Sequence, residues 1–230
     1  MSDTIYQAAA LIVPMIFAIV FHEVAHGLVA RRLGDPTAEQ LGRLSLNPLR
    51  HVDPIGTILL PGALKLLGLP VFGWAKPVPV DFRRLRNPKR DMILVAAAGP
   101  GMNLVMAGVA AVALGLLLRP YIGAQEPAGL AGFIALNLFN FILINIFLAL
   151  FNLIPIPPFD GSHILEGLLP DSAAQAYGSL RKYGFLLVIG LIVVLPQLIP
   201  GFNPVGRLIG APVDWMTNHY LAIAQAVAGH

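Results

Sequence analysis

The sequence predicts an all-α polytopic membrane protein that forms one membrane-embedded domain over residues 1–230. Its 230 residues are 57% hydrophobic and only 12% charged, whereas soluble domains carry about 25% charged residues. Long stretches with at most one charged residue recur along the chain. The first of them contains a single charged residue, Glu23, which lies inside a His-Glu-Val-Ala-His motif. Together these observations predict several membrane-spanning helices, the first of which carries reactive side chains.

The uncharged stretches place the spanning helices. Each exceeds the about 20 apolar residues that a helix needs to cross a bilayer. They are residues 5–30, residues 92–118, residues 127–159, which begin with a loop, and residues 183–206. The tail, residues 207–230, contains Trp215 and Tyr220 and is too polar for a span, so we expect an interfacial helix there.

Residues 54–75 form an apolar segment that does not fit a regular span. It contains Lys65 and is interrupted by Pro54, Gly56, Pro61, Gly62, Gly68, Pro70 and Gly73. Irregular backbone at membrane depth is tolerated only where protein or a water-filled cavity covers it. The segment is therefore predicted to bend or to re-enter the membrane.

Basic residues indicate the orientation. Loops 31–53 and 76–90 are rich in Lys and Arg, and Arg181 and Lys182 precede the last span. Short loops of this kind stay cytosolic. All three lie on one side if residues 54–75 re-enter, which puts the N-terminus outside and the histidine motif about 8–14 Å below the cytosolic end of its helix. We expect a multi-pass protein of a prokaryotic cell membrane with its site toward the cytosol.

Composition also limits the partners and the processing. The net charge is only +3, and the basic residues flank apolar spans without interleaved aromatics, so a lipid bilayer and no nucleic acid is the expected environment. Residues 1–4 hold no Lys or Arg, which argues against a cleavable signal peptide. The oligomeric state is not readable from the sequence.

The histidine motif predicts a metal site. On a helix, His22 and His26 lie one turn apart on one face, so both imidazoles can bind one ion. Glu23 can reach a metal-bound water as its proton acceptor. The chain has no Cys, so the metal must be held by His, carboxylate and water. This combination predicts a zinc protease within the bilayer, with a metal or proton transporter that uses the same residues as a relay as the alternative.

Asp160 is the candidate third ligand. It follows Pro155, Pro157 and Pro158, which cannot continue an α-helix and so unwind the chain on the side where the histidines lie. The alternative is that Asp160 caps the N-terminus of a short helix at 161–168.

Two further histidines lie near the same side. His163 is one turn past Asp160 and can be a ligand, a partner of a ligand or an ordinary helix residue. His51 lies in a turn-rich loop, where it either orients a neighbour or lies in solvent.

Asn103 and Asn152 are polar residues within apolar helices. Each either forms a hydrogen bond between helices or donates its amide to the oxyanion that develops during peptide hydrolysis. The sequence does not separate the two roles.

With these motifs in order, the chain resembles the site-2 protease family of intramembrane zinc metalloproteases, in a compact form without peptide-binding or nucleotide-binding modules. The matching elements are His22-Glu23-Val-Ala-His26, Gly73-Trp74-Ala75-Lys76-Pro77-Val78, Ala98-Gly99-Pro100-Gly101-Met102-Asn103, and Asn152-Leu-Ile-Pro155 through Asp160-Gly161. The resemblance implies one zinc ion per chain, held by His22, His26 and Asp160, with Glu23 as the catalytic base.

The resemblance also implies an architecture. A three-helix catalytic core, here residues 5–30, 92–118 and 131–155, would lie within about 5–165, with accessory C-terminal helices at about 176–230. Residues 73–78 would match a small membrane-associated β element that pairs with an extended substrate, because a scissile bond must be unwound from its helix before it can be cut.

The function implied is hydrolysis of a peptide bond in or near the transmembrane segment of a single-pass membrane protein, as in regulated intramembrane proteolysis. Besides the transporter, a non-catalytic homologue that binds helices is the remaining alternative, and the presence of Glu23 argues against it.

Overall fold

The computed structural model describes residues 2–68, 73–123, 126–199 and 201–229, which are predominantly helical and contain no strand. In chain order the elements are α1 (Ser2–Arg32), α2 (Thr37–Gln40), η1 (Pro48–His51), η2 (Pro54–Leu59), α3 (Leu60–Leu66), η3 (Phe82–Arg84), α4 (Pro88–Leu118), η4 (Arg119–Tyr121), α5 (Gly129–Asn152), α6 (Asp160–Leu168), α7 (Asp171–Gly178), η5 (Ser179–Tyr183), α8 (Gly184–Ile189), η6 (Gly190–Val194), α9 (Leu195–Leu198) and α10 (Pro204–Ala228).

Among the described residues, four helical segments are long and apolar enough to cross a membrane, and the protein is a multi-pass membrane protein. They are Thr4–Arg32, Pro88–Tyr121, Gly129–Asn152 and Asp171–Leu198. The first three coincide with the predicted spans. The fourth begins earlier than the predicted 183–206 and ends before Gly201, whose φ of 77° lies in the left-handed region. The absence of charges did not predict the earlier start at Asp171, because α7 is polar yet continues into the apolar α8.

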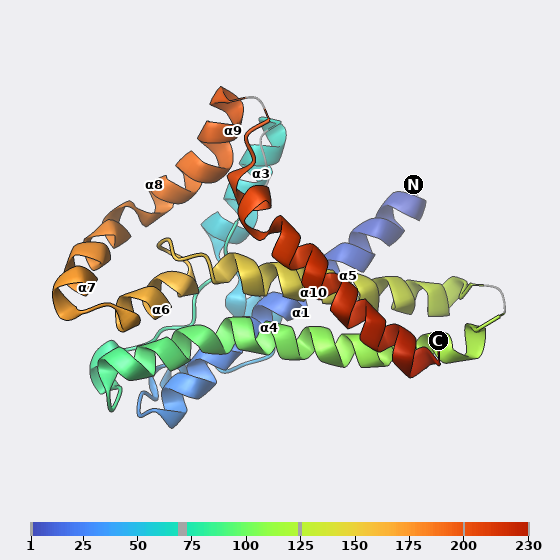
Figure 1. Ribbon diagram of the computed structural model, residues 1–230, viewed down its shortest axis with the longest axis horizontal. Helices are drawn as coiled ribbons and strands as arrows, with labels where there is room; N and C mark the ends of the chain where they lie inside the picture. Colours follow the sequence, from blue (N-terminus) through green and yellow to red (C-terminus); the bar gives the residue numbers. More distant parts are fainter. Residues whose placement is uncertain (1, 69–72, 124–125, 200, 230) are drawn as a thin grey trace.

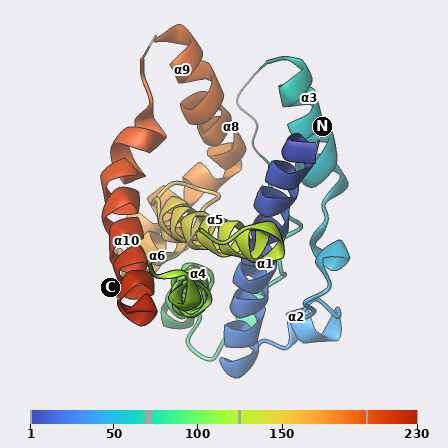
Figure 2. The same ribbon diagram turned by 90° about the vertical axis from the view of Figure 1, so that its right-hand side faces the viewer.

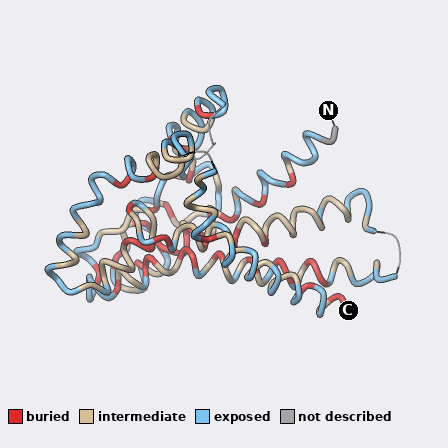
Figure 3. The backbone as a smooth tube through the Cα atoms, turned by 45° about the horizontal axis from the view of Figure 1, so that its top comes forward, coloured by how far each residue is buried: buried red, intermediate tan, exposed pale blue. Residues whose placement is uncertain are grey.

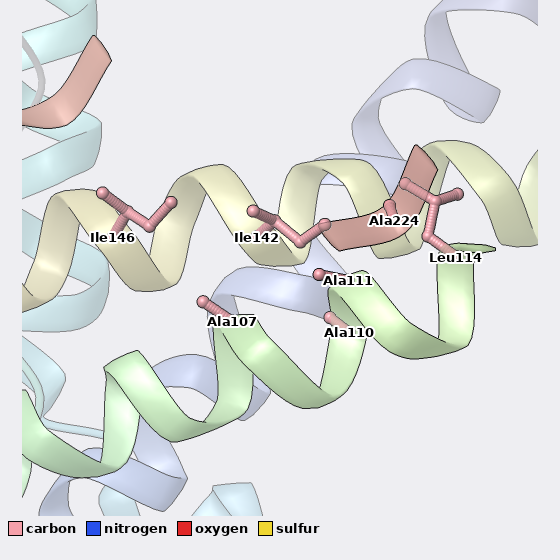
Figure 4. Close-up of a cluster of buried hydrophobic side chains, with 7 residues drawn as sticks. All are labelled: Ala107, Ala110, Ala111, Leu114, Ile142, Ile146 and Ala224. Atoms are coloured by element: carbon pink, nitrogen blue, oxygen red, sulfur yellow. The ribbon is translucent and has the colours of Figure 1, made fainter. Parts of the chain in front are cut away.

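Helices α1, α4 and α5 pack against one another, and α4 and α5 run side by side (Figure 1). One buried cluster joins α4, α5 and α10 (Figure 4). It comprises Ala107, Ala110, Ala111, Leu114, Ile142, Ile146 and Ala224. The alanines let the helix backbones approach closely, which is how helices gain packing contacts inside a bilayer.

Helix α10 packs along α4 and α5 and is not among the described segments that are long and apolar enough to cross a membrane, in agreement with a tail too polar for a span, while its interfacial location stays a prediction. The Tyr220 hydroxyl donates to the Leu104 carbonyl at 3.0 Å. Gly115 leaves room for Ala224, whose carbonyl a Cβ at position 115 would strike. Small residues at the contact with α4 therefore allow α10 to pack on the core. The polar residues of α10 make it less apolar than the four candidate spans.

The segment predicted to re-enter contains two short helices, η2 and α3, of six and seven residues. Together they are shorter than the about 20 residues that a span needs, in agreement with a segment that does not cross as a helix. After them, residues 73–81 have no regular secondary structure. The β element predicted at 73–78 is thus not observed, because the inward N–H groups of this segment bond to the backbone of η1 and η2 and to the Glu23 carboxylate and not to a neighbouring strand.

Helices α7 to α9 leave the core at an angle (Figure 1), and Figure 2 shows α8 and α9 on the opposite side of the molecule from α3. Buried backbone gathers where α1, α4, α5 and α6 meet, whereas the arm of α7 to α9 is largely exposed (Figure 3). Of the polar candidate residues, His22, His26 and Asn103 are buried.

Candidate metal centre

Helix α1 presents two neighbouring faces to two different parts of the site. His22 and His26 are buried and face α4 and Asp160. One residue further along, Glu23 and Gly27 face segment 73–81. Glu23 contacts the backbone of Val78, and a Cβ at Gly27 would lie 2.9 Å from a Val78 methyl group. The helical repeat of 3.6 residues creates both faces from one short motif.

The side chains of His22, His26 and Asp160 converge on one point. The two Nε2 atoms are 3.1 Å apart, and Asp160 Oδ2 lies 3.1 Å from His22 Nε2 and 3.4 Å from His26 Nε2. One ligand atom from each residue lies within 4.8 Å of the other two. A single ion can therefore contact all three.

The outer ring nitrogens fix the state of both imidazoles. His22 Nδ1 is 2.6 Å from Asn103 Oδ1, and His26 Nδ1 is 2.7 Å from the Val95 carbonyl. Both partners are acceptors, so each Nδ1 carries the proton and each Nε2 has a free lone pair. Metal-binding histidines are oriented by outer contacts of this kind.

Three features of the group fit a metal ion. Asp160 Oδ2 is buried and has no hydrogen-bond partner among the described residues. Two Nε2 lone pairs turned toward the same point repel each other unless a cation lies between them. At Gly99 on α4, a Cβ would strike His26 Nε2 and His22 Cε1, so the lack of a side chain makes room for the site. Two imidazoles and one carboxylate are a donor set that zinc accepts, with a fourth position left for water.

Asp160 begins α6, and its side chain makes no capping hydrogen bond. The capping role is therefore not what the structure shows for this carboxylate. Burial by itself raises the pKa of the Asp160 carboxyl, but when His22 and His26 are protonated, with no ion between them, their hydrogen bonds and charge outweigh this and hold that pKa well below its ordinary value. The carboxylate form, which a cation needs, is the favoured one.

Segment 73–81 is held against the protein through alternate residues. The N–H groups of Trp74, Lys76 and Val78 donate to Gly56 O at 3.1 Å, His51 O at 2.9 Å and Glu23 Oε2 at 2.8 Å. Arg43 donates to the Lys76 carbonyl at 2.7 Å and to the Pro77 carbonyl at 3.4 Å. This spacing of two residues is that of an extended chain with one edge turned inward.

The two prolines of the segment, Pro77 and Pro79, lie at the alternate positions, where no inward N–H is needed. Within the described part of the chain, the N–H and C=O of Ala75 have no hydrogen-bond partner. We call the backbone of Ala75 the outer edge of the segment. Trp74 stacks edge-on against Phe185 of α8 at 5.3 Å between ring centroids, and this links the segment to the helical arm.

Asn103 forms hydrogen bonds with the histidine motif and with other residues of α1 and α5, whereas Asn152 bonds within its own helix. Asn103 is fully buried and donates to Ala18 O at 3.2 Å and to Asn145 Oδ1 at 2.7 Å, besides its contact with His22. Asn152 donates to Leu148 O within its own helix. Oxyanion donation by either residue stays a prediction. Asn145 was not identified from the sequence, because nothing distinguishes it there from the other asparagines of α5.

His51 and His163 lie outside the cluster of three. His51 is 3% exposed, so it does not lie in solvent, and its Nε2 bonds to Ser45 O at 2.8 Å. His163 lines a cleft of about 520 Å³ between α4, α6 and α7. Burial, together with the Arg181 guanidinium, lowers the pKa of His163 below its ordinary value.

The cleft beside His163 lies next to the metal ligands but includes none of them. Val80, near the end of segment 73–81, and Phe82, which follows the segment, form one side of it. Charged pairs cross its rim: Lys89 bonds to Asp171 at 2.6 Å, and Arg181 bonds to Glu166. The cleft is thus bounded by the helix that carries Asp160 and by the end of the extended segment.

Comparison with known proteins gives one family. Residues 117–196 match the model of peptidase family M50, a stretch that includes Asp160 but not the histidine motif. The chain is 36% identical over 211 residues to a Bacillus subtilis protein named "Putative zinc metalloprotease YwhC", covering 87% of this chain and 91% of that protein.

Two mycobacterial relatives carry the name "Putative zinc metalloprotease Rip2". The Mycolicibacterium smegmatis protein is 30% identical over 179 residues, covering 77% of this chain and 64% of that protein. The Mycobacterium tuberculosis protein is 33% identical over 188 residues, covering 80% and 66%. No solved structure matches the chain.

Proposed function

Because the chain belongs to the site-2 protease family, peptidase family M50, and is a zinc metalloprotease, we propose that it is an intramembrane endopeptidase. It hydrolyses a peptide bond in or near the transmembrane segment of a single-pass membrane protein, as in regulated intramembrane proteolysis. The observation that carries this proposal is the convergence of His22, His26 and Asp160 within spanning and membrane-adjacent helices.

In the proposed mechanism, His22, His26 and Asp160 are the zinc ligands. Bound zinc supplies a Lewis acid for the scissile carbonyl and lowers the pKa of a coordinated water toward about 7. The Glu23 carboxylate accepts the proton of the attacking water and passes it to the leaving amine. The Val78 N–H, which donates to Glu23 Oε2, holds the carboxylate beside the ligands.

The substrate is proposed to bind as an extended chain on the outer edge of segment 73–81. A peptide bond inside a helix is covered by its own hydrogen bonds, so the substrate must unwind around the scissile bond. The unused N–H and C=O of Ala75 can then pair with it, while Trp74, Lys76 and Val78 keep the segment in place. This assigns recognition to the substrate backbone, so binding would not depend on one particular side-chain sequence.

Water is proposed to enter from the cytosolic side through the cleft beside His163. The cleft lies between the end of segment 73–81 and the helix that begins at Asp160. The basic loops at this end of α1 and α4 support a cytosolic orientation. Cleavage here would release a cytosolic fragment of the substrate.

A transporter is less well supported by the same residues. A transport path needs polar groups distributed through the membrane along several helices. Here the titratable groups of the site gather in one place, where the C-terminal half of α1 meets the start of α6. A non-catalytic homologue is distinguished by experiment.

The test compares wild type with Glu23→Gln on a transmembrane substrate in detergent, with bound zinc measured in both. Glu126→Gln, an exposed carboxylate at the far end of α4 and α5, is the matched control. We expect about one zinc in all three proteins, cleavage by wild type and control, and a loss of at least about 10³-fold in Glu23→Gln. Zinc without cleavage in wild type, on several substrates, would support the non-catalytic alternative. Absence of zinc would overturn the metal centre.

A further inference from the structure

A line of buried amide groups runs from α5 through α4 to the metal ligand His22. The Asn145 amide donates to the Phe141 carbonyl at 2.7 Å. Its oxygen accepts from the Asn103 amide, also at 2.7 Å. The oxygen of Asn103 in turn accepts from His22 Nδ1 at 2.6 Å. Asn103 and Asn145 are both 0% exposed.

The direction of this line is set at its far end. A backbone carbonyl can only accept, so the Phe141 carbonyl requires the nitrogen of the Asn145 amide to face it. The oxygen of Asn145 then faces Asn103 and requires the nitrogen of that amide. Asn103 is left with its oxygen toward His22, which must hold its proton on Nδ1. The Nε2 atom consequently has a free lone pair, which is the form that binds a metal.

We infer that Asn145 is a positioning residue of the zinc centre, which acts through Asn103 to fix the tautomer and the ring orientation of His22. It touches neither substrate nor metal. The inference rests on the zinc centre proposed above and adds a residue to it.

The other asparagines of α5 show which contact matters. Asn137 donates to Phe133 O at 2.8 Å, four residues earlier in its own helix, as Asn145 does to Phe141 O. Asn145 differs because its oxygen also accepts from α4. Replacing Asn137 therefore removes the same local bond without touching the line to His22, and Asn137→Leu is the matched control.

The experiment measures zinc affinity, by competition with a chelator, for purified wild type, Asn145→Leu and Asn137→Leu. Leu has the same branching and the same number of side-chain heavy atoms as Asn but offers no acceptor to Asn103. Outer contacts of metal ligands are worth about 10- to 100-fold in affinity, and for this contact one step further out we expect a loss of about three- to tenfold. The visible spectrum of the cobalt-substituted protein should change in Asn145→Leu and not in Asn137→Leu. A role in helix packing alone would lower the Tm and leave the spectrum unchanged.

A double-mutant cycle tests whether Asn145 acts through Asn103. In an Asn103→Leu background, Asn145→Leu should cause no further loss of zinc affinity. If Asn145→Leu does not fold, Asn145→Ser, whose shorter side chain withdraws the acceptor from Asn103, should give the same direction of change. The inference is overturned if the folded Asn145 variant keeps wild-type zinc affinity and cobalt spectrum, or if its effect is undiminished without Asn103. Wild type that binds no zinc would instead refute the centre itself.

Discussion

The carboxylate of Glu23 accepts a hydrogen bond from the backbone N–H of Val78 at 2.8 Å. This bond connects the proposed base to the segment on which we propose that substrate binds. Gly27, one turn further along α1, allows Val78 to lie against the helix. The proposed base and the proposed substrate-binding backbone are thus joined by one hydrogen bond, so a displacement of either should displace the other.

Shortening the base should separate catalysis from metal binding. In Glu23→Asp the carboxylate is one methylene shorter and cannot both reach the Val78 N–H and stay beside the water. We expect kcat/KM to fall by about 10²-fold or more with an unchanged zinc content. Glu39→Asp, an exposed residue paired with Arg31, controls for shortening elsewhere. Equal activity of the two variants would contradict the role of Glu23.

A methyl group at position 99 should disrupt the metal centre. A Cβ at Gly99 would strike both imidazoles, whereas a Cβ at Gly101 meets nothing within 4 Å. We expect Gly99→Ala to weaken zinc binding by about 10- to 100-fold and to abolish cleavage. Gly101→Ala should behave as wild type in the same chelator competition. Similar zinc affinities for the two alanine variants would show that α4 does not shape the site.

Removing one N–H from the outer edge should weaken substrate binding alone. Proline at position 75 lacks the N–H that we propose to pair with substrate. We expect KM to rise by about 10-fold in Ala75→Pro, in line with about 1.4 kcal/mol for one lost hydrogen bond, with zinc content unchanged. Ala75→Gly, which keeps the N–H, should have the KM of wild type. A KM in Ala75→Pro that matches Ala75→Gly would place substrate pairing elsewhere.

Acid should destabilise the protein through His163. Its pKa is lowered in the folded state, first by burial and then by Arg181. Below the ordinary pKa of about 6.5, the unfolded chain therefore binds more protons, and stability is lost as pH falls. The charged or titratable groups that act on His163 are Arg181, Glu166, Asp160 and His26.

The check is thermal unfolding in detergent at pH 7.5 and pH 5.5. His163→Gln should show a smaller fall in Tm between these conditions than wild type. His219→Gln, an exposed histidine of α10, should retain the full fall. If His163→Gln loses as much Tm as wild type, the acid sensitivity has another source.

The sequence was informative where local geometry decides the structure. His22 and His26 are one helical turn apart, so their convergence follows from the repeat of an α-helix. Asp160 follows three prolines, which end α5 and turn the chain back. The uncharged runs placed the first three spans, since lipid exposure imposes the same apolarity on every such helix.

It was uninformative where the packing between distant helices decides. Four asparagines occur in α5, at positions 137, 140, 145 and 152, and only the rotation of α5 against α4 selects Asn145 as the partner of Asn103. The docking of α10 depends in the same way on Gly115 and Ala224, which touch across more than a hundred residues of chain. Residues 73–78 were expected to form a β element, but their inward bonds go to the Glu23 carboxylate and to the backbone of η1 and η2.

Pro77 and Pro79 have a further consequence, for self-association. A long row of free N–H and C=O groups would let two copies of the protein join edge to edge, which is a common start of aggregation. Because proline cannot donate, a ladder that begins at Ala75 cannot continue along this segment. The outer edge at Ala75 is too short to bind another folded copy by itself. It is sufficient to bind a peptide that the remainder of the site also holds. The two prolines thus protect a surface that must stay open.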